Sequence, residues 1–533
     1  MAPPDRLAAA LQHLSLGAWQ QAEIVAKAAV MNDPDDPHAA LLMGLAIAAM
    51  GEDIRAAPVM VRVAAERPGA DHPCLELAAL TPPLPRALIT RQFRACLRLA
   101  PDDDRLRLDF ATFLLEAGQV AEAETVLAGA PDSAAGYHLM GLIQAELGHF
   151  LAAIACFDHA VAMDPAAAAS WSNLGMMLKV EGRFAEAVAA HDHAVASTPA
   201  NHRFRVNRAV TLLKMGQWEA AWRDYESRLA LTDAPPIDRG RLMPSLAAGQ
   251  RLTGVTVMAL HEDGFGDTLQ FLRYLPLLAD RGATVVACVP PALERIMHRV
   301  PGVAAVETDC GRLPSHDFVC PMFSLPRVFG TNVDTIPPVP LLVSDATLVR
   351  QWAGRLPRGG LRVGLVWAGQ ARPTLPGFAT VDRRRSAGLA TFAPLFGAPG
   401  VSFVSLQAGP AARQARALGV AMTDPMPDAS DFADTAAIIA GLDVVVSVDT
   451  SVVHLAGLVR KPVFLLDRYD GCWRWLSGRS DSPWYPGLTI FRQDQPDDWS
   501  GPMAKAAASL RTMAACRNLG SSSAGTRQPA FVA

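Results

Sequence analysis

Two different spacings of apolar residues divide this chain of 533 residues. Up to about residue 230, apolar side chains recur every three or four positions, as they do on the buried face of amphipathic helices. Beyond residue 250, short β-branched runs such as GVTVMAL (254–260) and LDVVVSV (442–448) alternate with helical segments. Buried strands that alternate with helices predict parallel, doubly wound sheets. The pattern therefore predicts an all-α N-terminal region followed by an α/β region.

The helical region repeats itself. Residues 134–167 align with residues 168–201, so that Gly141 pairs with Gly175 and Pro165 pairs with Pro199. The offset matches the period of about 34 residues that is typical of tetratricopeptide (TPR) repeats. Small residues are expected where two helices cross closely, and glycine and proline are expected where helices end. We therefore expect a TPR solenoid whose concave face binds a peptide or protein, with a purely scaffolding or dimerising role as the alternative.

Two asparagines occupy the same position in successive repeats. Asn173 and Asn207 fall on the helices that are expected to face inward. An amide side chain both donates and accepts hydrogen bonds, so these residues are candidate contacts to the backbone of a protein acceptor. The alternative is that both are ordinary solvated helix residues.

Shifts in composition suggest the remaining boundaries. The TPR region spans residues 1–230, and a proline-containing linker covers residues 231–251. Two Rossmann-like halves then follow, separated by a proline-rich stretch, and the chain ends in a segment that is expected to be flexible. The predicted bounds of these three parts are 252–345, 360–515 and 516–533.

Three strand-to-helix loops of the α/β region hold polar residues where such folds bind ligands. In the first loop, Gly264 and Gly266 permit a tight turn and close backbone approach, and Asp267 opens the helix. The alternative for Asp267 is a role as an N-cap and nothing more.

The second loop contains the arginine run 383–385, and these guanidinium groups could clamp a diphosphate. The alternative for this run is a solvated loop. The third loop follows a buried strand and leads into a helix whose free N–H groups and dipole could hold a phosphate. It contains Asp449, Thr450, Ser451 and His454. Here the alternative is an ordinary capped helix with a histidine in the core.

Composition and charge narrow the possible partners. The net charge of −4 comes from 48 basic and 52 acidic residues, which gives no case for binding nucleic acid or an anionic membrane. The apolar stretches are interrupted before the roughly 20 residues that a membrane span needs, so no membrane insertion is expected. The N-terminus resembles a helix start more than a signal peptide, which predicts a cytoplasmic location. The eight cysteines form no C-x-x-C pair, so we expect buried thiols in a reducing compartment and no metal site.

Taken together, several segments resemble a known family. These segments are GFGDTLQFLRYLPLLADRGA, RVGLVWAG followed by DRRRS, VSFVSLQAGP, DFADTAAIIAGLDVVVSVDTSVVHLAG and RWLSGRSDSPWYP. They resemble the bacterial TPR-linked glycosyltransferases related to the heptosyltransferase family (glycosyltransferase family 9), over roughly residues 250–500. The layout is also similar to that of the O-linked N-acetylglucosamine transferases and of the flagellin glycosyltransferases, in which the arm holds the protein acceptor. The resemblance implies a GT-B pair of Rossmann-like domains.

The resemblance also implies roles for residues of the three loops. Asp267 would be the general base that takes the proton of the acceptor hydroxyl. Arg384 or Arg385 would neutralise the leaving phosphate without a metal. The residues implied in donor binding are Gly264, Gly266, Arg384, Arg385, Asp449, Thr450, Ser451 and His454. No cofactor is implied, because the nucleotide sugar is itself a substrate.

The function expected from these residues is metal-independent transfer of a sugar from a nucleotide sugar to a protein held by the TPR arm, with flagellin as one candidate acceptor. One alternative is a non-catalytic TPR adaptor whose GT-B region binds a nucleotide sugar or is vestigial. Another is a transferase that acts on a lipid or polysaccharide. The first Rossmann-like half is short for the acceptor domain of a GT-B enzyme, so either the arm completes the acceptor site or the activity has been lost.

Overall fold

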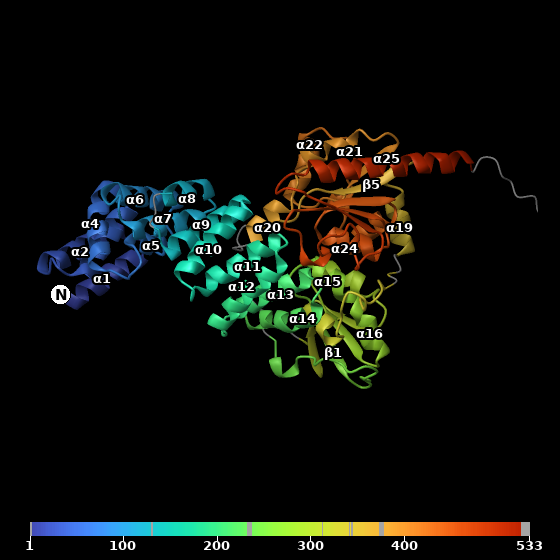
Figure 1. The fold of residues 1–533 in the computed structure, drawn as a ribbon, viewed down its shortest axis with the longest axis horizontal. Helices are drawn as coiled ribbons and strands as arrows, with labels where there is room; N and C mark the ends of the chain where they lie inside the picture. Colours follow the sequence, from blue (N-terminus) through green and yellow to red (C-terminus); the bar gives the residue numbers. More distant parts are fainter. Residues whose placement is uncertain are drawn as a thin grey trace, which may run out of the picture. The chain divides into compact units, whose positions relative to one another are not determined.

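A computed structural model describes residues 3–128, 132–231, 237–311, 313–340, 342, 345–371 and 378–523 (Figure 1). The chain consists of two compact units, Met1–Met177 and Leu178–Ala533. The order of elements confirms the expected fold class, because helical repeats come first and two parallel sheets follow.

The first unit is built from successive helices that pack in pairs. At the crossing of α9 and α10, a Cβ on Gly141 would lie 2.7 Å from the ring of Phe157, so only glycine allows the two helices to approach this closely. Gly148 ends α9 in the left-handed conformation, with a φ of 82°. The helices are α1 (Pro3–Ser15), α2 (Trp19–Asn32), α3 (Pro37–Ala49), α4 (Asp53–Glu66), α5 (Pro73–Ala78), α6 (Arg86–Leu99), α7 (Asp104–Glu116), α8 (Val120–Leu127), α9 (Ala134–Leu147) and α10 (Phe150–Met163).

The last repeats belong to the second unit, where they share a core with the α/β region. Trp218 and Trp222 are buried in the same apolar cluster as strand residues such as Val257. The Trp222 indole N–H donates to the carbonyl of Thr331 (2.9 Å), and Lys214 donates to the carbonyl of Gly471 (2.7 Å). The helices of these repeats are α12 (Phe184–Ser197), α13 (His202–Lys214) and α14 (Trp218–Tyr225), and the division between the units falls within α11 (Ala168–Val180). The predicted domain end at residue 230 is therefore not the end of a compact unit, because the apolar face of the last repeat packs on the α/β region.

The first sheet has four parallel strands in the order β3-β2-β1-β4. The strands are β1 (Thr256–Leu260), β2 (Thr284–Cys288), β3 (Val303–Glu307) and β4 (Phe318–Pro321). The helices of this half are α15 (Phe265–Phe271), α16 (Leu275–Asp280), α17 (Pro291–Met297) and α18 (Leu325–Val328). The strand order changes direction between β1 and β4, and the loops after these two strands therefore flank a crevice.

The second sheet has five parallel strands in the order β6-β5-β7-β8-β9. The strands are β5 (Leu361–Val366), β6 (Val401–Ser405), β7 (Val444–Val448), β8 (Val463–Asp467) and β9 (Leu488–Arg492). The helices are α19 (Ala346–Ala353), α20 (Phe378–Arg384), α21 (Ala393–Phe396), α22 (Arg413–Ala417), α23 (Phe432–Ala440), α24 (Ser451–Leu458) and α25 (Ser500–Ser523). Here the order changes direction between β5 and β7, so the loops after these strands flank a second crevice.

Two predicted non-globular segments are partly ordered. Helix α25 runs to Ser523 and packs against the second sheet, so the tail predicted from residue 516 begins inside a helix (Figure 1). In the predicted linker, residues 232–236 lie outside the described residues. Its later part adds to the first sheet, because Leu242 bridges to Val319 of β4.

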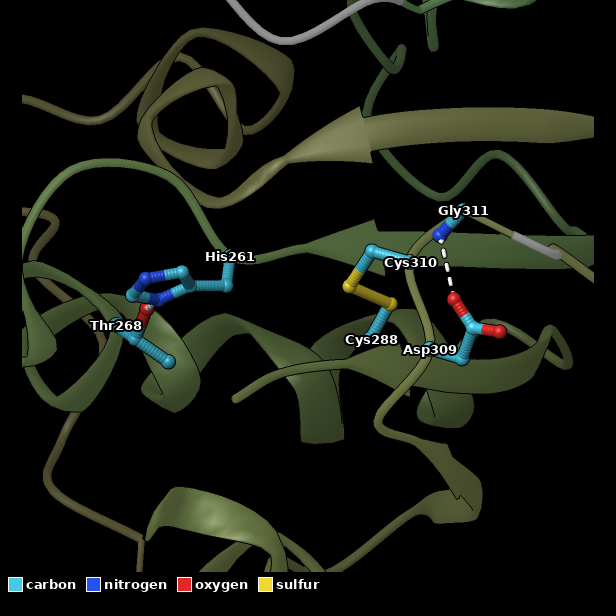
Figure 2. Close-up of a disulfide and its surroundings, with 6 residues drawn as sticks. All are labelled: His261, Thr268, Cys288, Asp309, Cys310 and Gly311. Carbon is cyan, nitrogen blue, oxygen red and sulfur yellow. Dashed lines mark hydrogen bonds between the residues drawn. A yellow bond between two sulfur atoms is a disulfide. The ribbon is translucent and has the colours of Figure 1, made fainter. Parts of the chain in front are cut away.

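A disulfide joins Cys288 at the end of β2 to Cys310 in the loop after β3 (Figure 2). Their Cα atoms are 5.9 Å apart, within the usual range for disulfides. The expectation that every cysteine stays a thiol is therefore wrong for this pair. The two residues are far apart in the sequence, and only the parallel pairing of β2 with β3 brings them together.

Among the described residues, no helix combines the length and the apolar composition that a membrane crossing requires.

The shared core predicts where the chain can be cut. Deleting residues 1–167 should leave a folded protein, whereas deleting residues 1–230 should not. The longer deletion removes Trp218, Trp222 and Tyr225 from the core, and each large buried side chain contributes roughly 1.5–3 kcal/mol. That loss takes up much of the roughly 5–15 kcal/mol that stabilises a folded protein. Thermal unfolding followed by circular dichroism tests this, and equal midpoints for the two fragments would contradict it.

Candidate functional site

A cleft with a volume of about 350 Å³ opens where the carboxyl ends of the two sheets face each other in the second unit. The first sheet contributes the loops after β1 and β4, and the second sheet contributes the loops after β5, β7 and β8. The lining residues are Tyr225, Asp263, Gly264, Phe265, Gly266, Asp267, Phe323, Gly369, Gln370, Val381, Arg385, Asp449, Thr450, Ser451, His454, Arg468, Cys472 and Arg474. The cleft thus includes both points at which the strand order reverses, where parallel α/β folds bind their ligands.

Asp267 lies in the first turn of α15. The N-cap of this helix is Gly264, and the Asp267 carboxylate accepts a hydrogen bond from the backbone N–H of Gly264 (3.0 Å). Asp267 is therefore not the N-cap that the alternative interpretation predicted. It is the third residue of the helix, and from that position its side chain stabilises the helix start. Its other carboxylate oxygen pairs with the guanidinium of Arg474. Burial raises the pKa of Asp267, and Arg474 opposes that shift.

Arg474 follows β8 and is held on several sides. Its Nε donates to the side-chain oxygen of Gln270 (2.6 Å), and its Nη1 lies 3.0 Å from Cys472 Sγ. The guanidinium also stacks 4.6 Å from the ring centre of Trp473. Burial acts to lower the pKa of Arg474, but Asp267 acts in the opposite sense and the net shift is upward. Arg474 is thus a fixed cation beside the candidate base.

His454 lies in the first turn of α24 and is buried. Its Nδ1 lies 2.9 Å from the hydroxyl of Tyr485, and its ring stacks on Trp475. Burial lowers the pKa of His454 well below its usual range, and the charge of Arg474 acts in the same direction. The ring is therefore neutral near pH 7 and can serve a ligand as a hydrogen-bonding group rather than as a cation.

Gly266 allows α15 to approach α24. A Cβ at this position would lie 3.0 Å from His454 Cδ2 and 3.4 Å from Ser451 Cα. Any larger residue would therefore push the two helix starts apart. Since one helix follows the first sheet and the other follows the second, Gly266 sets how closely the two walls of the cleft meet.

The loop after β7 brings three predicted residues into the cleft: Asp449, Thr450 and Ser451. Thr450 is the N-cap of α24, yet its side chain makes no capping bond; instead its hydroxyl lies 3.2 Å from that of Ser447. The first backbone N–H groups of α24 are therefore left without a side-chain cap, which is the arrangement that binds anions at helix N-termini.

The arginine run divides between two environments. Arg385 lines the cleft and donates to the carbonyl oxygens of Gln370 (3.3 Å) and Asp449 (3.4 Å). Arg384 lies 3.5 Å from a carboxylate oxygen of Asp470, and it is not among the described residues that line the cleft. Of the two arginines that the sequence left as alternatives, the structure thus places Arg385 at the site.

Several cleft residues were missed by the sequence interpretation. Arg468 follows β8, lines the cleft and pairs with Asp470 (2.8 Å). The only local signal for Arg468 is an arginine in the loop after a buried strand, a position that many solvated arginines share. Arg474 is the first residue of RWLSGRSDSPWYP, one of the segments that carry the family resemblance, but no role was assigned to it.

Tyr225, also missed, comes from the last repeat helix, α14. Its ring packs 5.2 Å from that of Phe323, and it lines the cleft. The end of the repeat region is fixed to the loop after β1 by a buried ion pair between Arg228 and Glu262 (2.8 Å). The helical repeats therefore supply part of the cleft wall.

The two asparagines that were expected to contact an acceptor are not brought to this cleft. Asn173 lies on α11 in the first unit, and Asn207 lies on α13 in the second. Both are partly exposed. Their role in holding an acceptor stays a prediction.

Comparisons with known proteins place TPR repeats in the N-terminal region. Residues 91–147 and residues 134–166 each match a family model described as tetratricopeptide repeat. Over 468 residues, the chain is 26% identical to the protein FlbA of Caulobacter vibrioides (strain ATCC 19089 / CIP 103742 / CB 15), which covers 80% of this chain and 76% of that protein.

Solved structures similar to the chain include the glycosyl transferase family 9 from Veillonella parvula DSM 2008. The two are 12% identical with a TM-score of 0.38, covering 50% of this chain and 99% of that one. MamA is 18% identical with a TM-score of 0.25, covering 27% of this chain and 87% of that one.

The ion pair predicts a specific pattern of stability. Asp267→Asn keeps the hydrogen bond to Gly264 but leaves Arg474, whose side chain is 12% exposed, without its partner, which should cost about 1.5–3 kcal/mol. Arg474→Gln should cost a similar amount, and the double variant should be more stable than the sum of the two losses predicts. Urea unfolding of all four proteins measures this coupling. Strictly additive losses would show that the two side chains do not interact.

Proposed function

We propose that this protein is a glycosyltransferase that moves a sugar from a nucleoside-diphosphate donor to a protein held by the helical repeats. The observation that supports the proposal most strongly is the arrangement of charge across the cleft. Arg385, Arg468 and the uncapped start of α24 lie on the second sheet, and the carboxylate of Asp267 lies on the first. The paired parallel sheets are also the arrangement expected of a GT-B enzyme.

The second-sheet wall suits a diphosphate. Arg385 Nε is buried and has no hydrogen-bond partner among the described residues, so this group gains a partner when an anion binds. Arg468 offers a second guanidinium, and the α24 backbone offers N–H groups that point along the helix dipole. Asp449, Thr450, Ser451 and His454 lie around the same position, where they would hold the donor.

The first-sheet wall supplies a base. In the transfer, the acceptor hydroxyl oxygen attacks the anomeric carbon and gives its proton to the Asp267 carboxylate. The bond between that carbon and the diphosphate oxygen breaks, and the nucleoside diphosphate leaves with the electron pair. Two of the lone-pair positions on Asp267 are used by Gly264 and Arg474, and the remaining positions can accept the proton. Arg385 and Arg468 neutralise the charge that develops on the leaving group, so in this mechanism no metal is required.

The acceptor would enter on the side of Tyr225 and Phe323. Tyr225 belongs to the last repeat, so an acceptor bound by the repeats can reach the cleft without a large first domain. In this proposal the short first half is completed by the helical arm. Flagellin remains one candidate acceptor.

The hydrogen-bond partners of Asp267 favour a second candidate function, that of a non-catalytic adaptor. Both oxygens of Asp267 already have protein partners, which is the pattern of a structural carboxylate. A non-catalytic adaptor that binds a nucleotide sugar would retain the second-sheet wall and have no need of a free base.

Calorimetry with a panel of nucleoside-diphosphate sugars, followed by a hydrolysis assay, separates these functions. Binding with slow hydrolysis supports the transferase. Binding without any turnover, alone or with candidate acceptors, supports the adaptor. If no member of the panel binds, both functions are wrong.

Donor affinity should depend on Arg385 far more than on Arg384. Arg385→Ala removes a charge-assisted hydrogen bond worth about 1.5–3 kcal/mol, which corresponds to a rise in donor Kd of roughly 10- to 100-fold. Arg384→Ala is the matched control, because this arginine pairs with Asp470 away from the cleft lining. Calorimetric titration of both variants measures the difference. Equal effects would remove Arg385 from the donor site.

To test whether Asp267 is the base, the transfer rate must be measured in variants whose stability is also known. Asp267→Asn should lower the transfer rate about 10²–10⁴-fold. The variant that also contains Arg474→Gln should recover stability without recovering rate. If the double variant transfers sugar within a few-fold of wild type, Asp267 is a structural residue and the proposed mechanism needs another base.

A further inference from the structure

We propose that a buried cluster in the first compact unit, His72, Cys74 and Cys96, binds a thiophilic divalent cation of the Zn²⁺ type. His72 is the N-cap of α5, Cys74 is the second residue of that helix, and Cys96 lies on α6. Neither the TPR match nor the cleft of the second unit accounts for these three side chains. The proposal is therefore independent of the proposed transferase activity.

The spacing of the ligand atoms fits a tetrahedral metal centre. The two sulfur atoms are 3.7 Å apart, and one imidazole nitrogen lies within 4.8 Å of both. In a tetrahedral zinc site with Zn–S bonds of about 2.3 Å, two thiolate sulfurs lie roughly 3.8 Å apart. Cys74 and Cys96 thus already have the separation that such a centre needs, without movement of α5 or α6.

The polar groups of the cluster are poorly satisfied by the protein. His72 is only 2% exposed, and its Nε2 is buried with no hydrogen-bond partner in the described part of the chain. Its Nδ1 accepts one long bond from the backbone N–H of Cys74 (3.2 Å). A neutral imidazole has one lone pair, so a metal bond through either nitrogen would replace the 3.2 Å bond that Nδ1 accepts, and a metal bond through Nε2 would also give that buried atom a partner. The ring would therefore lose one long hydrogen bond when it binds a cation.

Neighbouring side chains supply the outer interactions of a metal site. The Gln92 side-chain amide lies 3.5 Å from Cys96 Sγ, where it can donate to a metal-bound thiolate. Met60 Sδ lies 4.0 Å from Cys74 Sγ and covers one side of the cluster, but a thioether is not among the usual ligands of zinc. Two thiolates balance the charge of a divalent cation, so binding would release the two thiol protons to solvent.

A cavity of about 280 Å³ gives access to the cluster. His72 lines it together with Asp103 and Arg105, next to the turn that follows α4. The cavity thus extends from the surface to His72, although the imidazole and both sulfurs are buried. The sequence predicts no such site, because the three residues form no C-x-x-C pattern and meet only when α5 packs against α6.

The test measures zinc bound to the full-length chain. The protein is expressed with added zinc and desalted, and the metal is then determined by elemental mass spectrometry; the expected result is one zinc per chain. Cys74→Ser and Cys96→Ser should each abolish retention, whereas Cys156→Ser, which changes a half-buried thiol on α10, should leave it unchanged. Replacement by Co²⁺ should add a near-ultraviolet thiolate-to-cobalt absorption band in the wild type and in Cys156→Ser only.

A second readout covers the case in which the cysteine variants fail to fold. In the wild type, a chelator should lower the thermal midpoint, and added zinc should restore it. A wild-type chain that retains no zinc would overturn the proposal, and so would a Cys96→Ser protein that still binds one equivalent. An intact mass that shows Cys74 and Cys96 joined as a disulfide in protein prepared with zinc would also overturn it.

Discussion

The ion pair between Asp267 and Arg474, whose side chains are 19% and 12% exposed, connects the two walls of the cleft. Asp267 comes from the helix after the first strand of the first sheet, and Arg474 comes from the loop after β8 of the second. Separating the two charges would leave each largely desolvated without its partner, so the contact favours keeping the two loops together. The same residues fix their surroundings, because Asp267 holds the start of α15 through Gly264, and Arg474 holds Gln270. The shape of the cleft therefore depends on this one contact.

The last helical repeats help to position Arg474 for its ion pair with Asp267. Lys214 donates to the carbonyl oxygens of Gly471 and Cys472, three and two residues before Arg474. Burial lowers the pKa of Lys214 to about 8, although Asp467 acts to raise it. The repeats thus serve the α/β region as part of its core and as a wall of its cleft through Tyr225. A boundary drawn where the helical pattern ends divides a unit that folds together.

The fold class and part of the site could be predicted from the sequence, because the alternation of strands and helices is visible in it. Strand–helix alternation predicts parallel sheets, and a parallel sheet collects its loops at one edge, so each of the three loops was expected at such an edge. That Asp267 of the first half and Asp449 and His454 of the second share one site was implied by the family resemblance. Arg468, Arg474 and Tyr225 were not predicted, because their positions depend on how the loop after β8 and the last repeat pack. The pairing of Cys288 with Cys310 was missed for the same reason, since it follows from the pairing of β2 with β3. The choice between Arg384 and Arg385 likewise depended on which side chain at the end of α20 is directed toward Asp449; it is Arg385, the residue after the helix.

The central claim is that an anionic nucleotide-sugar donor occupies the cleft beside Arg474. Cys472 reports on this directly, because it lines the cleft and its sulfur contacts Arg474, whereas Cys516 is exposed elsewhere in the same unit. The measurement is the alkylation rate of each thiol by mass spectrometry, with and without a nucleoside-diphosphate sugar. The account predicts that a donor slows alkylation of Cys472 and leaves Cys516 unchanged. Unchanged alkylation of Cys472 at saturating concentrations of every donor would contradict it.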